Sequence, residues 1–211
     1  MKEGLLIEEL LVNLPQNIEN MQLPAPELVN YWRLAEKRMF YIDYEINEGV
    51  LEIQKSIINI NIEDKDIESS ERKPIIIFLD TPGGLLVETM SLAQTMIMSK
   101  TPVITVNMGT AYSGGAMLLM AGHKRYALKY SKAMIHTGST TGLCGTYEQT
   151  EAAQKLYRTQ INEMGQFILE RSSIDDKTFK RNKAKDWYMT EEEQVQYGIV
   201  DKVLESLDEI I

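Results

Sequence analysis

Two stretches of the chain decide its fold class: residues 74–84 read PIIIFLDTPGG, and residues 103–121 read VITVNMGTAYSGGAMLLMA. Each begins with a run of apolar and β-branched residues, which is typical of a strand covered on both faces of a sheet. Each then enters a turn made of glycine and other small residues. Between the two stretches, apolar residues from Leu86 to Ile97 recur at helical spacing. This alternation of strand, helix and strand predicts an α/β layer architecture with right-handed crossovers.

The pattern extends toward the N-terminus. Residues 38–44 (RMFYIDY) are rich in aromatic and β-branched residues and predict a strand. Asn47 is the expected N-cap of a following helix, and residues 63–73 are expected to form a solvated loop. The apolar face of that helix is predicted from the spacing of Val50, Ile53, Ile57 and Ile60. Residues 1–26 have mixed composition and are expected to form an N-terminal arm or axial segment, which leaves residues 27–211 as a single domain.

Toward the C-terminus, two short strands are predicted over residues 125–128 and 133–136. Residues 137–146 carry small and hydroxyl side chains and predict a loop or an irregular edge strand. A long helix is expected from about residue 146 to 171, because apolar residues recur along one face. Residues 186–203 then close the domain with a short, Glu-rich helix.

The composition excludes several classes of protein. Among 211 residues, 22 basic and 31 acidic side chains give a formal charge of -9, and no basic cluster is present, which argues against a nucleic-acid or anionic-membrane partner. The uncharged stretch 101–122 contains a proline and four glycines, so it predicts buried core rather than a membrane helix. One cysteine excludes a disulfide framework, and two histidines exclude most zinc sites, so no metal is expected. Because no secretory signal is visible, the expected compartment is the cytoplasm.

Ser113 is the leading candidate nucleophile. It follows a predicted strand and begins a predicted helix, so the amides of the first helical turn would face an anion that forms beside its hydroxyl. The arrangement resembles a nucleophile elbow, although Ala111 replaces the usual glycine two residues earlier. From this window alone, an N-cap role for Ser113 remains open.

The two histidines differ in position. His136 ends an apolar strand and enters a small-residue loop, which predicts an imidazole at a sheet edge, whereas His123 lies in a polar turn beside two cations. Both positions are also compatible with structural roles. Cys144, eight residues after His136, is a competing nucleophile or a small filler among glycines.

The glycine-rich turns are compatible with anion binding but not with nucleotide binding. Amides of residues 80–84 could contribute to an oxyanion site, or these residues could form an ordinary tight turn. Gly115 and Ala116 stand where a phosphate loop requires Lys and Ser/Thr, and Gly83 and Gly84 lack the spacing of a dinucleotide fingerprint. The sequence therefore predicts no nucleotide cofactor.

Four segments together resemble the proteolytic subunit of the ATP-dependent Clp protease, a serine peptidase family. They are the Pro82-Gly83-Gly84 turn after an apolar strand, the Ser113 turn that enters an apolar helix, the strand end at residues 134–136, and the closing Tyr197-Gly198-Ile199-Val200-Asp201. Their order and spacing are similar to the family's, and the resemblance extends from about Trp32 to Leu204.

The resemblance implies a crotonase-like α/β fold with a protruding handle helix after residue 146. It implies Ser113 as the nucleophile, His136 as the general base, and an oxyanion hole formed by the amides of Gly84 and Gly114. It also implies two stacked seven-membered rings, an AAA+ unfoldase that supplies unfolded polypeptides, and peptide binding by strand addition at residues 137–146.

The chain departs from the family pattern at three places. Tyr112 and Gly114 flank the serine where the family usually has Ala and Met, and Thr137-Gly138 replaces the usual Gln-Pro. A count back from Tyr197 without gaps puts Asn182 at the position of the triad aspartate. A Ser-His-Asn site with slow or conditional activity is therefore expected. If the intervening loop differs, the carboxylate is supplied instead by one of three nearby residues, Asp175, Asp176 or Asp186.

Four functions fit these observations. The first is a serine endopeptidase that works through an acyl-serine intermediate, and the second is a catalytically weak subunit with a structural role in a mixed ring. A phage-type capsid-maturation peptidase is the third. The fourth is an acyl-CoA hydratase on the same fold, but it would require paired glutamates that the Gly83 and Gly114 turns lack.

Overall fold

A computed structural model of the chain describes residues 26–140, 142 and 144–211. Apart from Pro26, the expected N-terminal arm lies outside the described residues. The strands are β1 (Met39–Ile42), β2 (Ile75–Thr81), β3 (Val103–Tyr112), β4 (Lys124–Ala127), β5 (Lys132–Ile135), β6 (Trp187–Met189) and β7 (Lys202–Val203). The helices are α2 (Pro26–Glu36), α3 (Val50–Glu63), α4 (Leu86–Met98), α5 (Gly114–Ala121), α6 (Tyr147–Arg171), α7 (Asp176–Asn182) and α8 (Glu191–Gln196). Short 3-10 turns are η2 (Ser69–Glu71) and η3 (Leu207–Glu209).

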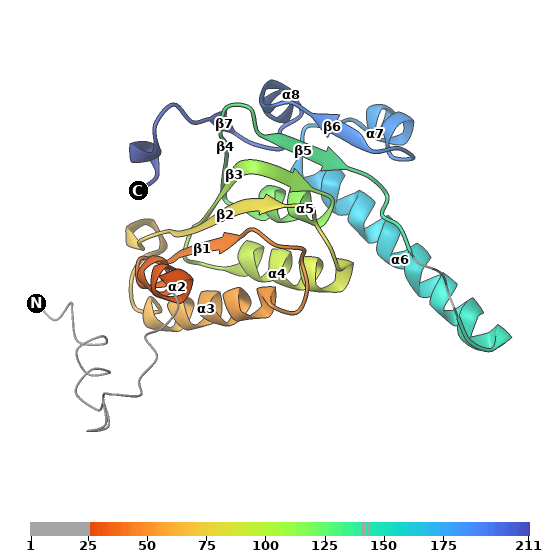
Figure 1. Cartoon of the computed structure of the whole chain (residues 1–211), viewed down its shortest axis with the longest axis horizontal. Helices are drawn as coiled ribbons and strands as arrows, with labels where there is room; N and C mark the ends of the chain where they lie inside the picture. Colours follow the sequence, from red (N-terminus) through yellow and green to blue (C-terminus); the bar gives the residue numbers. More distant parts are fainter. Residues whose placement is uncertain (1–25, 141, 143) are drawn as a thin grey trace, which may run out of the picture.

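The strands form one sheet in the order β1-β2-β3-β4-β7, and all neighbours along this path are parallel. Helices α3, α4 and α5 lie along one face, and α6 reaches away from the body of the domain (Figure 1). The predicted α/β layer architecture is therefore confirmed.

Strand β3 divides the sheet. Its first half pairs with β4 and its second half, from Thr110 to Tyr112, pairs with β5. β5 in turn pairs in antiparallel fashion with β6. The C-terminal ends of β2, β3 and β5 therefore meet at one edge of the sheet, which is the usual place for a site in such folds.

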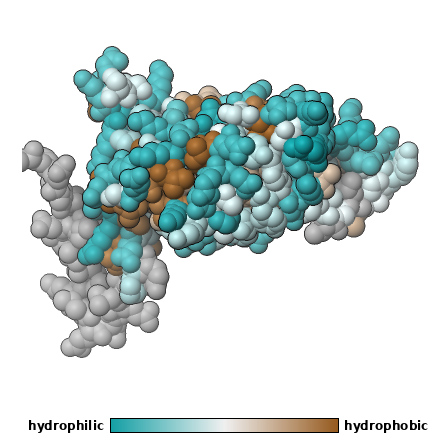
Figure 2. Space-filling view, turned by 90° about the horizontal axis from the view of Figure 1, so that it is seen from above, coloured by the Kyte–Doolittle hydropathy of each residue, from teal (hydrophilic) through white to brown (hydrophobic). Residues whose placement is uncertain are grey.

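The apolar run in β2 is buried on both faces, as its sequence predicts. Ile75, Ile77 and Leu79 belong to the main core with α3, α4 and α5, whereas Ile76 and Phe78 belong to a second cluster on the opposite face. No described helix contributes to the second cluster, which otherwise contains residues from β3 and the C-terminal segment. The surface seen in Figure 2 is mostly hydrophilic, with one main band of apolar side chains and a few smaller apolar spots.

Helix α3 is confirmed, and the four residues of its predicted apolar face are all buried. Its N-cap is Gly49 rather than Asn47, whose Oδ1 instead accepts the Gly49 N–H at 2.8 Å. The predicted solvated loop after α3 is only partly solvated. Asp64 is buried there because Arg38 donates two hydrogen bonds to its carboxylate, and this contact holds its pKa below the usual range.

Two further elements differ from their predictions. The buried side of α4 centres on Thr89, Leu92, Ala93 and Met96, so it is rotated from the predicted stripe. Strand β3 continues to Tyr112 instead of ending before a turn at Gly109. It continues because Asp80 accepts both the backbone N–H and the hydroxyl of Thr110, which keeps this segment alongside β2. None of the described helices is long and apolar enough to cross a membrane.

Candidate active site

Ser113 occupies a sharp turn between β3 and α5. Its backbone has φ 52 and ψ -115, a conformation that costs a non-glycine residue free energy and is common at functional sites. The Ser113 N–H donates to the carbonyl of Met134 at 2.8 Å, and the Ser113 carbonyl accepts the Ala116 N–H at 3.0 Å. Although Ser113 has the N-cap position of α5, its side chain makes no capping hydrogen bond. Its hydroxyl is therefore available for another partner.

That partner is His136, directly after β5. The distance from His136 Nε2 to Ser113 Oγ is 2.8 Å, and the distance from His136 Nδ1 to Asp186 Oδ1 is 3.1 Å. The His136 side chain is mostly buried, at 23% exposure, and that of Asp186 is 56% exposed. Serine, histidine and aspartate thus form one continuous chain of contacts.

Asn182, the residue expected in the third position, is not part of this chain. It is buried at the end of α7, and its side-chain N–H donates to the Thr178 carbonyl in its own helix at 3.0 Å. The structure therefore corrects the assignment that follows from the gapless count. The carboxylate that contacts His136 belongs instead to Asp186, because Trp187 pairs with Ile135 in the antiparallel ladder and the next residues along are Asp186 and His136.

The two other candidate carboxylates are engaged at the start of α7. Asp175 is the N-cap and accepts the Thr178 N–H at 2.9 Å, and hydrogen bonding with the side chain and the backbone of Thr178 lowers its pKa. Asp176 forms an ion pair with Lys180 at 2.6 Å. Both carboxylates stabilise the helix that precedes Asp186 rather than contacting His136.

The glycine turn after β2 packs directly against Ser113. A Cβ atom on Gly83 would lie 2.5 Å from the Tyr112 carbonyl oxygen and 2.8 Å from Ser113 Cβ, and one on Gly84 would lie 2.1 Å from the Ile46 carbonyl oxygen. Only glycine fits either position. Within the described residues, the N–H groups of Gly84 and Gly114 donate to no protein acceptor, so both are available to a ligand beside Ser113.

A cavity of about 700 Å³ opens beside these groups. Its walls combine Ser113, His136 and the two glycines with apolar side chains and with Gly138, Ser139 and Thr140 of the predicted peptide-binding segment. The apolar side chains are those of Leu85, Leu86, Met117, Met134, Tyr157, Ile161 and Met164. Residues of α6 thus form part of the wall, which gives the inner part of its apolar stripe a partner.

The family model described as Clp protease matches residues 27–207 of this chain. The chain belongs to the Clp protease family. Membership confirms the Clp-type α/β fold and implies a serine-type peptidase. In general, Clp proteases act on peptides and assemble into rings with an unfoldase.

In this Clp protease, His123 has a structural position. Its Nδ1 accepts the Val103 N–H at 3.0 Å, so the ring contacts the sheet backbone. Burial, together with the positive charge of Arg171, lowers the pKa of His123 and favours the neutral ring.

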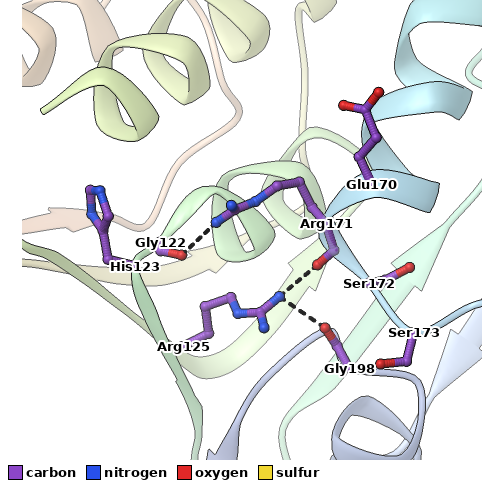
Figure 3. Close-up of a pocket in the computed structure, with 8 residues that line it drawn as sticks. All are labelled: Gly122, His123, Arg125, Glu170, Arg171, Ser172, Ser173 and Gly198. Carbon is purple, nitrogen blue, oxygen red and sulfur yellow. Dashed lines mark hydrogen bonds between the residues drawn. The ribbon is translucent and has the colours of Figure 1, made fainter.

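His123 also lines a second, polar hollow, shown in Figure 3. There the guanidinium groups of Arg125 and Arg171 point toward backbone carbonyls. Arg125 Nη1 donates to Arg171 and Gly198, and Arg171 Nη2 donates to Gly122. These hydrogen bonds join the end of α6 to the strand and loops beside it, which gives the hollow a structural explanation.

Two other residues that the sequence analysis singled out lie outside the cavity. Cys144 is exposed and does not line the cavity. Tyr112, although next to the serine in sequence, packs edge-on against Tyr188 with ring centroids 5.5 Å apart and does not line the cavity either. The bulky side chain of Tyr112 therefore does not block access to Ser113 from the cavity. The residue that the sequence-based assignment placed only among its alternatives is Asp186, and the signal that identifies it is the pairing of β5 with β6.

Proposed function

We propose that this chain is a serine endopeptidase subunit of a self-compartmentalised Clp-type protease, with Ser113, His136 and Asp186 as its triad. The observation that carries the proposal is the 2.8 Å contact between His136 Nε2 and Ser113 Oγ, at a strained turn that opens into a cavity. Such a contact is what a nucleophile and its general base require.

The geometry supports acyl transfer in two halves. Ser113 Oγ attacks the peptide carbonyl carbon while His136 Nε2 takes the hydroxyl proton, and His136 then passes that proton to the departing amine as the C–N bond breaks. Water attacks the acyl-serine in the second half, again with His136 as base. The N–H groups of Gly84 and Gly114 stabilise the negative charge that develops on the carbonyl oxygen in both halves.

Asp186 is proposed to orient His136 by accepting its Nδ1–H and to stabilise the imidazolium that forms during attack. The carboxylate is more than half exposed, so water screens its charge more than in a fully buried triad. We therefore propose that the site is active, with a lower catalytic rate than a triad in which the carboxylate is buried.

The assembly is proposed to be two stacked rings of seven subunits in the cytoplasm, fed with unfolded polypeptides by an AAA+ unfoldase. Helix α6 supports this proposal, because its outer part carries Leu156 at 59% exposure and extends from the body of the domain (Figure 1). A peptide is proposed to lie as an added strand along the segment that includes Gly138, Ser139 and Thr140.

Labelling with a fluorophosphonate tests this function. We expect the chain to be labelled, and we expect Ser113→Ala and His136→Ala to abolish labelling while the variants keep the wild-type circular dichroism. Labelling that persists in Ser113→Ala would reject the proposed nucleophile. Labelling that appears only after mixing with an active sibling subunit would favour the mixed-ring alternative.

A further inference from the structure

One acidic side chain lies in the wall of the active-site cavity and has no role in the proposed triad. Glu45 lines the cavity together with Ser113 and His136. Residues around it run beside the glycine turn, since the Ile46 N–H donates to the Gly83 carbonyl at 2.7 Å and the Leu85 N–H donates to the Ile46 carbonyl at 2.9 Å. Glu45 is thus held next to the turn that carries the proposed oxyanion amides.

Glu45 and its neighbour Ile46 differ in burial. Ile46 is fully buried in the main core, whereas Glu45 is exposed and lines the cavity. Within the described part of the chain, the Glu45 carboxylate forms no ion pair with any basic side chain. Its charge is therefore available to a bound substrate.

Among the residues that the structure describes, no lysine or arginine lines the cavity. Asp186, whose carboxylate contacts His136, adds a second acidic group near the reacting atoms. The formal charge of the chain is -9. All of these charges favour a cationic group in the cavity and disfavour an anionic one.

Much of the remaining wall is apolar, with Leu86, Met117, Ile161 and Met164 among its residues. Apolar surface beside a carboxylate matches a side chain that has an aliphatic stem and a cationic end. Lysine and arginine have this form, because their methylene groups pack on apolar surface while the charged end reaches a polar partner.

We propose that Glu45 is a specificity-determining residue, which selects substrates that place a lysine or arginine side chain in the cavity beside the scissile bond. This inference rests on the proposed peptidase function and adds a substrate class to it. An ion pair in a partly exposed cavity favours the basic substrate by about fivefold.

Matched fluorogenic peptides test the proposal. The two peptides of a pair differ at one residue, which is lysine in one and norleucine in the other. Norleucine has the same aliphatic stem without the ammonium group. The varied residue is one of the two that flank the scissile bond. For at least one position, we expect kcat/KM of the wild type to be about fivefold higher for lysine at low salt. The ratio should fall as salt is added, because salt screens the pair.

The decisive variant is Glu45→Gln, which removes the charge and keeps the shape. We expect it to bring the lysine-to-norleucine ratio to about one. Glu48→Gln is the matched control, since Glu48 is also exposed, lies in the same connection between β1 and α3 and does not line the cavity. It should keep the wild-type ratio. A ratio of one in the wild type at every position, or an unchanged ratio in Glu45→Gln, overturns the proposal.

A binding measurement separates this inference from the proposed function. Fluorescence anisotropy with the same peptides and Ser113→Ala measures the preference without turnover, and it should show the same fivefold difference, lost when Glu45→Gln is added. If norleucine peptides are hydrolysed in a Ser113-dependent manner and no lysine preference exists, only the Glu45 inference fails. If binding shows the preference and no hydrolysis depends on Ser113, the proposed function fails instead.

Discussion

Trp187 lies directly opposite Ile135 in the antiparallel pairing of β6 with β5, and one step along each strand brings Asp186 to His136. A strand register, rather than a helix, therefore positions the carboxylate of the proposed triad. Registers of this kind are fixed by the side chains that each face must bury. In this chain Ala133 and Met189 are paired and fully buried, which locks the pairing two residues away.

Removal of the carboxylate at position 186 should reduce activity. In a buried serine-protease triad, exchange of Asp for Asn costs about 10⁴-fold in rate. Because Asp186 is 56% exposed, we expect Asp186→Asn to lower kcat/KM for a fluorogenic peptide by about 10- to 100-fold.

The substitution Asn182→Asp, at the position that the gapless count indicates, should not raise peptidase activity. Asn182→Asp introduces a carboxylate that has no N–H to donate to the Thr178 carbonyl. The Asn182 side chain contacts its own helix and not His136, so we expect no rise in kcat/KM. An increase of about tenfold or more in Asn182→Asp, with no loss in Asp186→Asn, would contradict the assignment of Asp186.

The backbone strain at Ser113 should be measurable as a difference in the free energy of unfolding between two variants. Glycine adopts positive φ without the penalty that other residues have, so Ser113→Gly relieves strain that Ser113→Ala keeps. Both variants lack the Ser113 hydroxyl, so loss of its hydrogen bond does not distinguish their stabilities. We expect Ser113→Gly to be about 1 kcal/mol more stable than Ser113→Ala, or about 2–4 °C in Tm. Equal Tm values in thermal unfolding would show that the turn is unstrained.

The close approach of Gly83 to the serine predicts that an added methyl group there is damaging. In Gly83→Ala the new Cβ would clash with the Tyr112 carbonyl and with Ser113 Cβ. We expect fluorophosphonate labelling to slow by at least about tenfold and stability to fall by about 2 kcal/mol.

The control for this change is Gly142→Ala. Gly142 also has positive φ, at 117°, but a Cβ there meets no atom within 4 Å. Both substitutions therefore carry backbone strain, and only the first creates the clash. Equal losses of labelling rate in the two variants would rule out the contact with Ser113 as the cause.

His123 should make stability fall on acidification. Burial and Arg171 lower its pKa in the folded state below the ordinary value of 6.5. When pH drops below about 6.5, the unfolded chain therefore takes up the proton first, and protonation favours unfolding. Above that pH the ring is neutral in both states and the effect disappears.

His123→Asn tests this pH dependence, because asparagine can still accept the Val103 N–H without titrating. We expect the Tm of the wild type to fall more steeply than that of His123→Asn between about pH 6.5 and 5. Parallel curves would mean that His123 does not contribute.

The sequence predicts the α/β layer architecture because β2 and the first half of β3 are apolar runs, typical of strands that are covered on both faces of a sheet. It indicates Ser113 as a candidate nucleophile because the residue stands between an apolar strand and a helix, whereas the roles of Gly84 and Gly114 follow from the resemblance to the Clp family. It does not predict the end of β3, since Gly109 and Thr110 form a typical turn sequence and only the contact with Asp80 extends the strand.

The sequence does not predict helices α2 and α7 or the pairing of β6 with β5. Helices α2 and α7 are short, and their stability comes from packing rather than from a strong pattern of their own. The position of Asp186 depends on the pairing of β6 with β5, strands that are about 50 residues apart in sequence. A count along the chain assumes that the loop between them follows the family's path, whereas the pairing of strands in space decides which residue faces His136.

Strand β3, which pairs with β2, β4 and β5, leads directly into Ser113. The turn at Ser113 is therefore connected to the strand with which three other strands of the sheet pair. Fraying at the surface of the domain would leave the serine in place, and displacement of the serine would require the centre of the sheet to open. Loss of the nucleophile on heating should thus coincide with global unfolding, so heat would inactivate and denature this domain in a single event.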